Sequence, residues 1–143
     1  MLQELGFTAD LADHLQNFNP DSLLGYRCQP PQQCLSSVII ERNIVPLWEC
    51  GVVLTYFNPS SRFFEKCSLE TIGEPFYRLA SAQSVLADLI IDLYEDELTI
   101  EELSELAIIL GFRSIERLIT EAVSHQGQTY ISWRNSFPAT CQG

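Results

Sequence analysis

Few residues in this chain have the types and spacing that catalysis requires. The two histidines, His14 and His125, lie far apart in the sequence, and neither belongs to a recognisable catalytic signature. Cys50, beside Gly51, could in principle be activated as a nucleophile, but the sequence identifies no partner residue for it. The chain contains no glycine-rich phosphate loop, no GxSxG motif and no HExxH motif. We therefore expect that the protein is not an enzyme and uses no cofactor.

The spacing of the potential metal ligands does not fit a metal site. A calcium loop that began at Asp92 would have Tyr94 at its third position and Leu103 where a bidentate glutamate is required. The cysteines are odd in number and form no CxxC pair, which argues against zinc: Cys28, Cys34, Cys50, Cys67 and Cys141. We expect no bound metal, and we expect most of the thiols to be reduced, buried side chains of a cytosolic protein.

Acidic residues dominate the charged groups of the chain. Eight basic residues against nineteen acidic ones give a formal net charge of -11 at pH 7. The stretch from Leu79 to Gly111 has no Lys, Arg or His and contains eight acids: Asp88, Asp92, Glu95, Asp96, Glu97, Glu101, Glu102 and Glu105. Such a charge repels phosphate backbones and favours encounter with basic proteins, so we expect no nucleic-acid partner. The alternative is an acidic surface that only keeps the protein soluble.

No part of the sequence predicts a membrane segment. The N-terminus lacks a basic region followed by a long apolar run, and no window approaches the ~20 apolar residues of a membrane span. The densest apolar stretch, Leu89 to Leu93, is interrupted by Asp92. We expect a soluble, cytoplasmic protein without a membrane partner.

The first half of the chain predicts a helix followed by a sheet. Residues 8–18 have helical spacing with Thr8 as N-cap, and the Pro- and Gly-containing residues 19–34 are predicted to be irregular. A sheet of three or four antiparallel strands is predicted over residues 35–69, with strands at Val38–Ile40, Ile44–Trp48, Val52–Phe57 and Arg62–Leu69. Pro46 cannot donate a ladder hydrogen bond, which indicates an edge position or a bulge.

The second half, residues 79–125, predicts helices. The helix from Leu79 to about Glu95 has so narrow a polar stripe that it must be covered on more than one side. Thr99 begins a capping box, Gly111 is a plausible C′ residue, and Ser114 is expected to cap a third helix. Residues 129–143 are predicted as a short strand or a docked tail. The fold class is thus α+β in a single domain, 1–143: a short antiparallel sheet packed against C-terminal helices, with one N-terminal helix.

A binding surface is predicted where aromatic residues of the sheet meet the acidic helix. Trp48 and Tyr56 are the expected anchors for a partner, and five carboxylates are expected to steer a basic partner toward them: Asp88, Asp92, Glu95, Asp96 and Glu97. The alternative is that the aromatic residues only fill the core.

The run Val38 to Asp96 resembles the C-terminal two-thirds of the SUKH (SMI1/KNR4-like) superfamily. In that family a strand leading to a proline, here Ile44-Val45-Pro46-Leu47, precedes hairpin strands, here Gly51 to Phe57 and Phe63 to Leu69. An apolar acidic helix follows, here Ser81 to Asp96. The resemblance implies an α+β protein-binding domain, since bacterial members look like immunity proteins against toxins and others are regulators or scaffolds.

Two features depart from the family pattern. The chain has Asn17-Phe18-Asn19-Pro20 where the family usually has a Tyr/Phe-Asn-Gly turn, and the pair of helices after Leu98 is an addition. No family binding motif matches position by position, so the resemblance assigns no site residues.

The sequence therefore predicts a non-catalytic protein-binding module, an acidic adaptor or immunity-type protein that recognises a partner protein or its tail. The expected partner is a protein with a basic or apolar peptide segment. Two alternatives stay open. One is an assembly factor or chaperone for a larger complex, such as a carboxysome shell, and the other is a metal-binding or enzymatic domain.

Overall fold

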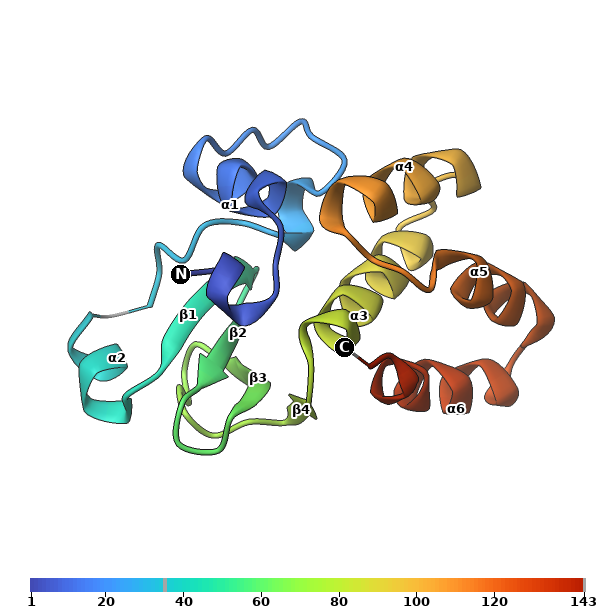
Figure 1. Ribbon diagram of the computed structural model, residues 1–143. Helices are drawn as coiled ribbons and strands as arrows, with labels where there is room; N and C mark the ends of the chain where they lie inside the picture. Colours follow the sequence, from blue (N-terminus) through green and yellow to red (C-terminus); the bar gives the residue numbers. More distant parts are fainter. Residues whose placement is uncertain (35, 143) are drawn as a thin grey trace.

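The computed structural model describes residues 1–34 and 36–142, which form an α+β fold (Figure 1). The N-terminal part contains a 3₁₀ turn η1 (Gln3–Leu5), α1 (Ala9–Gln16), a second 3₁₀ turn η2 (Gly25–Arg27) and α2 (Ser36–Arg42). Four strands follow: β1 (Val45–Cys50), β2 (Val53–Asn58), β3 (Phe63–Ser68) and β4 (Tyr77–Leu79). The C-terminal part contains α3 (Ala82–Glu95), α4 (Ile100–Leu110), α5 (Ile115–Ser124), α6 (Gln128–Ser136) and a last 3₁₀ turn η3 (Pro138–Thr140).

The strands form one antiparallel sheet in the order β1-β2-β3-β4. The register between β1 and β2 shifts between Pro46 and Trp48, and β1 is the first strand of the sheet, so the prediction of an edge or a bulge at Pro46 is confirmed. Gln29 makes an isolated antiparallel bridge to Glu49, which covers the outer side of β1. Leu35, where the predicted sheet begins, lies outside the described residues.

The predicted strand at Val38–Ile40 is wrong, because these residues lie in helix α2. Asn43 adopts a left-handed conformation with φ 52, its N–H donates to the carbonyl of Ile40, and Ile44 N–H donates to the carbonyl of Ile39. This hydrogen-bond pattern ends a helix and leaves one apolar side for packing. Val38 and Ile39 pack against a small buried cluster on the sheet. β-branched residues therefore form a helix here because tertiary packing outweighs their strand preference.

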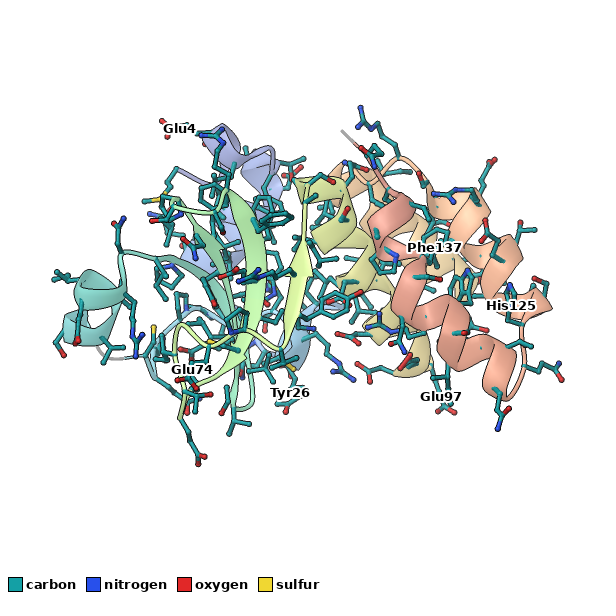
Figure 2. The ribbon with its side chains drawn as sticks, turned by 90° about the horizontal axis from the view of Figure 1, so that it is seen from below. Glu4, Tyr26, Glu74, Glu97, His125 and Phe137 are labelled. Carbon is teal, nitrogen blue, oxygen red and sulfur yellow. The ribbon has the colours of Figure 1, made fainter. Side chains whose placement is uncertain are left out.

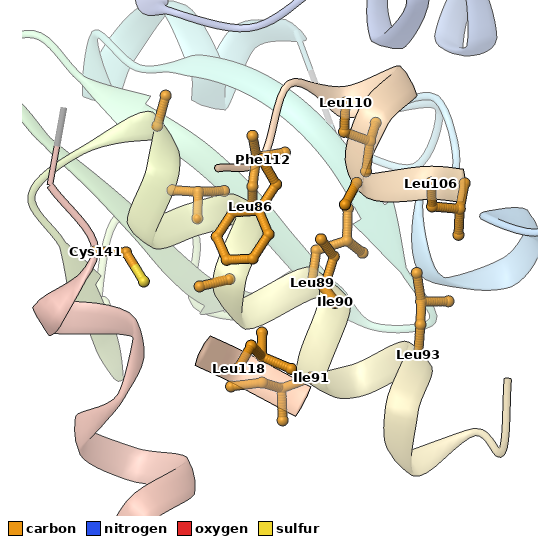
Figure 3. Close-up of a cluster of buried hydrophobic side chains, with 14 of the residues drawn as sticks. Leu86, Leu89, Ile90, Ile91, Leu93, Leu106, Leu110, Phe112, Leu118 and Cys141 are labelled. Atoms are coloured by element: carbon orange, nitrogen blue, oxygen red, sulfur yellow. The ribbon is translucent and has the colours of Figure 1, made fainter. Parts of the chain in front are cut away.

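Helix α3 is the centre of the molecule. The Ser81 side chain caps it by accepting from Ser84 N–H, and eleven of its residues are buried. One side packs with sheet residues such as Trp48 and Phe64, and other sides pack with α4 and α5 through residues such as Leu106 and Leu118 (Figure 3). The prediction that this helix is covered on more than one side is confirmed. Within residues 1–34 and 36–142, no helix is long and apolar enough to cross a membrane.

The caps of the next two helices agree with the predictions only in part. Thr99 and Glu102 form the predicted capping box of α4, and Gly111 follows the helix with φ 70. Ser114 occupies the N-cap position of α5, but its side chain makes no capping hydrogen bond. The predicted N-cap of α1 is confirmed, since Thr8 Oγ1 accepts from Leu11 N–H at 3.3 Å.

The short strand considered for Thr129–Trp133 is wrong, because these residues lie in α6. Trp133 and Phe137 are one helical turn apart and both are buried, with ring centroids 5.1 Å from each other. Figure 2 shows Phe137 among the C-terminal helices. In the helix, Tyr130, Trp133 and Phe137 lie on the same side, and neighbouring rings are in contact. In a strand, Tyr130 would lie on the opposite face from Trp133 and Phe137.

Candidate functional site

A network of ion pairs joins the sheet to α3 and α6. Lys66 Nζ on β3 lies 2.8 Å from Asp88 Oδ2, and Arg134 Nη1 on α6 lies 2.9 Å from Asp88 Oδ1. A second nitrogen of Arg134 lies 2.8 Å from Asp92 Oδ1, one turn further along α3. Asp88 and Asp92 thus face two cations that come from distant parts of the sequence. The carboxylates hold the elements together instead of pointing into solvent.

The same network continues toward the C-terminal end of α3. Arg27 in η2 makes a bidentate pair with Asp96, with nitrogen–oxygen distances of 2.7 and 2.8 Å. The Arg27 guanidinium lowers the pKa of the Asp96 carboxyl below its ordinary value. Glu95 accepts a hydrogen bond from the Tyr130 hydroxyl at 3.0 Å and lies 3.4 Å from Arg134 Nε. Glu97 is exposed and points outward (Figure 2).

A cavity of about 200 Å³ lies beside this network, between the sheet and α3. Trp48, Phe64 and Phe76 supply aromatic parts of its wall, and Arg27 and Lys66 supply its positive charges. Asp88 and Asp92 also line it. Because each of these cations pairs with a carboxylate, the described residues leave no unpaired cation in the cavity wall that would select an anion.

The structure corrects three of the predicted binding residues. Trp48 is 3% exposed and Tyr56 is 0% exposed, so neither aromatic ring projects from the surface as an anchor. Tyr56 also lies in the small cluster that α2 covers, apart from the cavity that Trp48 lines. Asp88 is 6% exposed and paired, so it does not lie on an open acidic surface. The sheet places aromatic rings in the core because alternate residues of a covered strand face inward.

The fold brings the predicted binding residues together only in part. Trp48, Asp88 and Asp92 line one cavity, and Asp96 approaches it through its pair with Arg27. Glu97 follows α3 as a left-handed residue with φ 69 and takes no part in the network of described residues. The predicted acidic surface of α3 is therefore mostly an intramolecular ion-pair network.

A second site, which the sequence did not predict, lies between α1 and α4. An apolar groove of about 230 Å³ is lined by four aliphatic side chains: Leu23, Leu24, Leu106 and Ile109. Three polar residues, Asp10, His14 and Ser22, also line it. Helix α1 lies beside α4 in the structure (Figure 1), and Thr8 Oγ1 donates to the carbonyl of Ile109 at 3.0 Å. We call these residues the α1–α4 groove; Ile108 is not one of them and lies next to Ile109 on the exposed side of α4.

The surface at the α1–α4 groove combines exposed isoleucines with acidic residues. Ile108 is 83% exposed and Ile109 is 40% exposed on α4. Glu101 and Glu105 share the exposed side of this helix, and among the described residues neither makes an ion pair. The sequence held a usable signal for this surface. Helical spacing places Ile108 opposite the apolar side of α4 that faces the hydrophobic core of the protein. That side consists of Leu103, Leu106, Ala107 and Leu110.

The geometry of the described residues gives little support to a metal site or to a catalytic histidine. Within the described part of the chain, no group of three or more His, Cys, Asp or Glu side chains is arranged to hold a metal ion. His14 Nε2 lies 2.9 Å from the carbonyl oxygen of Cys28, and the His125 ring stacks on Trp133. Both histidines thus have structural contacts.

Comparison of the chain with protein-family models, with curated proteins and with solved structures finds no match.

Proposed function

We propose that the protein is a non-catalytic protein-binding module whose α1–α4 groove binds a basic, amphipathic helical segment of a partner protein. One observation carries this proposal: Ile109 of the groove and the neighbouring Ile108 are exposed, and among the described residues the acidic side chains near them make none of the ion pairs that neutralise α3. An apolar contact flanked by carboxylates complements a helix that carries Leu or Ile on one side and Lys or Arg beside them.

The charge of the groove limits the kind of occupant. Asp10 lies at the groove, and Glu101 and Glu105 lie on the exposed side of α4, with no Lys or Arg between residues 79 and 111. A second copy of this acidic chain would bring like charges together at the same surface, which is unfavourable. A basic segment lowers that repulsion, and its association is faster at low salt.

The resemblance to the SUKH superfamily supports the same class of function. A strand with a proline, two hairpin strands and an apolar acidic helix occur in the order on which the resemblance rests. That family consists of protein-binding domains, and an adaptor or immunity-type role is consistent with a groove for a partner's segment. No observation favours the assembly-factor alternative or an enzymatic one.

The test uses a synthetic helical peptide of leucine and lysine as a probe of defined chemistry. Titration of the isotope-labelled protein should shift backbone amide signals in two stretches, 22–24 and 105–109. The double change Ile108→Ser and Ile109→Ser should weaken peptide binding by about tenfold, because contacts at the centre of an apolar site dominate affinity. The matched control is Ile131→Ser, which changes an isoleucine that is 61% exposed on α6.

Two results would contradict the proposal. Amide shifts spread over all acidic surfaces would indicate only non-specific charge attraction, and equal binding by the Ile108/Ile109 variant would remove the groove from the interaction. If the groove is supported, the same variants can be used to identify the natural partner. That partner should be captured from a lysate of the source organism by the wild type and by the Ile131 control, but not by the groove variant.

A further inference from the structure

Two cysteines that are distant in the sequence lie opposite each other next to the cavity. Gln29 N–H donates to the Glu49 carbonyl at 2.9 Å, and Glu49 N–H donates to the Gln29 carbonyl at 2.8 Å. Gln29 and Glu49 therefore form a hydrogen-bonded antiparallel pair, and the next pair along the two segments is Cys28 and Cys50.

The backbone around Cys28 shows that this next pair is of the non-hydrogen-bonded type. Cys28 N–H donates to the carbonyl of Gly25, and the Cys28 carbonyl oxygen lies 2.9 Å from His14 Nε2, so both groups point away from β1. Cys50, in turn, pairs with Val53 on the other side of β1. Residues opposite each other in such a pair have Cα atoms about 4.5 Å apart and side chains on the same face, which is within the range of disulfides.

The surroundings of the two sulfurs differ. Cys28 is 0% exposed, whereas Cys50 is half-buried and lines the 200 Å³ cavity. Burial raises the pKa of the Cys28 thiol, and the nearby Cys50 raises it further. Arg27 Nη1 lies 3.9 Å from Cys50 Sγ. An oxidant that enters the cavity therefore meets Cys50 first, with Cys28 behind it.

We propose that Cys28 and Cys50 form a redox-active dithiol that a hydroperoxide oxidises to an intramolecular disulfide, with Cys50 as the attacking and Cys28 as the resolving cysteine. This site is independent of the α1–α4 groove. All five cysteines are free thiols in this structure, which thus shows the reduced state.

The reaction with hydrogen peroxide balances in two steps. The Cys50 thiolate attacks one peroxide oxygen, the O–O bond breaks, and the released hydroxide takes up the proton that Cys50 lost, which gives one water and a sulfenic acid. The Cys28 sulfur then attacks the Cys50 sulfur, the S–O bond breaks, and the leaving hydroxide takes up the Cys28 proton as a second water. Two thiols lose two electrons in total and the peroxide gains them.

The test treats the full chain with one equivalent of hydrogen peroxide and maps the products by mass spectrometry of a non-reduced tryptic digest. Trypsin cuts after Arg27, Arg42 and Arg62, so Cys28 and Cys34 share the peptide 28–42, while Cys50 is in the peptide 43–62. We expect these two peptides to be linked, and dithiothreitol to separate them. The Cys34→Ser variant assigns the link, since it should still form when only Cys28 remains in the first peptide.

The Cys28→Ser variant tests the order of the two steps. Without the resolving thiol, the sulfenic acid on Cys50 should persist and give at least about tenfold more adduct with dimedone than in the wild type. If this variant does not fold, the linkage in the wild type and in Cys34→Ser still decides the proposal. A link from Cys34 to Cys50 or Cys67, links between chains only, or no link at all would overturn it.

Discussion

Asp88 is a buried carboxylate at the centre of the ion-pair network. Its carboxylate is 6% exposed and lies between Lys66 and Arg134, at 2.8 and 2.9 Å. The change Asp88→Asn leaves two partly buried cations with one fewer counter-charge, and removal of one partner from a buried pair costs about 3 kcal/mol. Urea denaturation at pH 7 should show a loss of stability of about this size.

Glu101→Gln is the matched control for Asp88→Asn. Glu101 is exposed on α4 and, within the described residues, has no ion pair, so its neutralisation should change the free energy of unfolding by less than about 0.5 kcal/mol. Equal effects of the two changes would mean that the ion-pair network contributes nothing to stability beyond its contribution to the overall charge.

The ion pair between Asp96 and Arg27 predicts that the free energy of unfolding depends on pH. Its pair with Arg27 lowers the pKa of the carboxyl in the folded state, so the pair stabilises the protein above the unfolded pKa of about 3.9. This contribution is lost as pH falls through the lower folded pKa. Since the Asp96 side chain is 37% exposed, solvent screening limits the contribution to at most about 1 kcal/mol.

The measurement compares the wild type with Asp96→Asn in urea at pH 7 and at pH 2.5. The variant should be less stable at pH 7, and the difference should shrink at pH 2.5, because below the ordinary pKa of about 3.9 the unfolded wild type takes up a proton at Asp96 and is thereby stabilised. A difference that stays constant with pH would mean that Asp96 acts through its shape and neutral hydrogen bonds instead of its charge.

At the scale of elements, the end of α3 depends on a residue in an unfavourable conformation. Glu97 has φ 69, and its N–H donates to the Tyr94 carbonyl while Leu98 N–H donates to the Leu93 carbonyl. This is the helix-ending pattern that glycine favours. Glu97→Gly should therefore raise the free energy of unfolding by about 0.5–1 kcal/mol, seen as a higher midpoint of thermal denaturation.

Glu105→Gly provides the comparison within the next helix. Glu105 is exposed in the middle of α4, where glycine costs about 1 kcal/mol, so this change should lower the midpoint. If both changes lower it, then Glu97 contributes a contact in the folded state that outweighs its backbone strain.

Local patterns predicted the elements with strong signals and missed those set by packing. The capping box at Thr99, the stop at Gly111 and the bulge at Pro46 depend on neighbours within a few residues, and the sequence was sufficient for each. Helix α2 is not predicted by its local pattern, because a run of β-branched residues suits a strand. Its packing partners on the sheet decide the outcome.

At the scale of the whole molecule, the neutralisation of the acidic residues of α3 could not be predicted, because their counter-charges are distant in the sequence. Arg27 pairs with Asp96 across 69 positions, and Arg134 pairs with Asp92 across 42. A sequence shows an uncompensated acidic helix, whereas the fold brings three cations onto it. Among the described residues, Glu101 and Glu105 on the exposed side of α4 make no ion pair, and their position is defined only by the assembled helices.

We expect that loss of the Arg134 ion pairs loosens the C-terminal segment without loss of the sheet. Residues 128–141 contact α3 through Arg134, through the buried Trp133 and Phe137, and through hydrogen bonds from Ser81 and Ser84 to the Cys141 carbonyl. Arg134→Ala removes the ion pairs of this segment with α3 and leaves Asp92 and Asp88 with one fewer cation. We expect a loss of about 2–4 kcal/mol in the stability of this segment.

Hydrogen exchange followed by mass spectrometry distinguishes local from global loosening. In Arg134→Ala, amides of residues 128–141 should exchange at least about tenfold faster, since each 1.4 kcal/mol of opening free energy is a factor of ten, while amides of β2 and β3 keep their wild-type protection. Arg42→Ala, on the exposed surface of α2, should change neither segment. Equal acceleration in the sheet would show that α6 and the sheet unfold as one cooperative unit, because the network that Arg134 completes would then stabilise both.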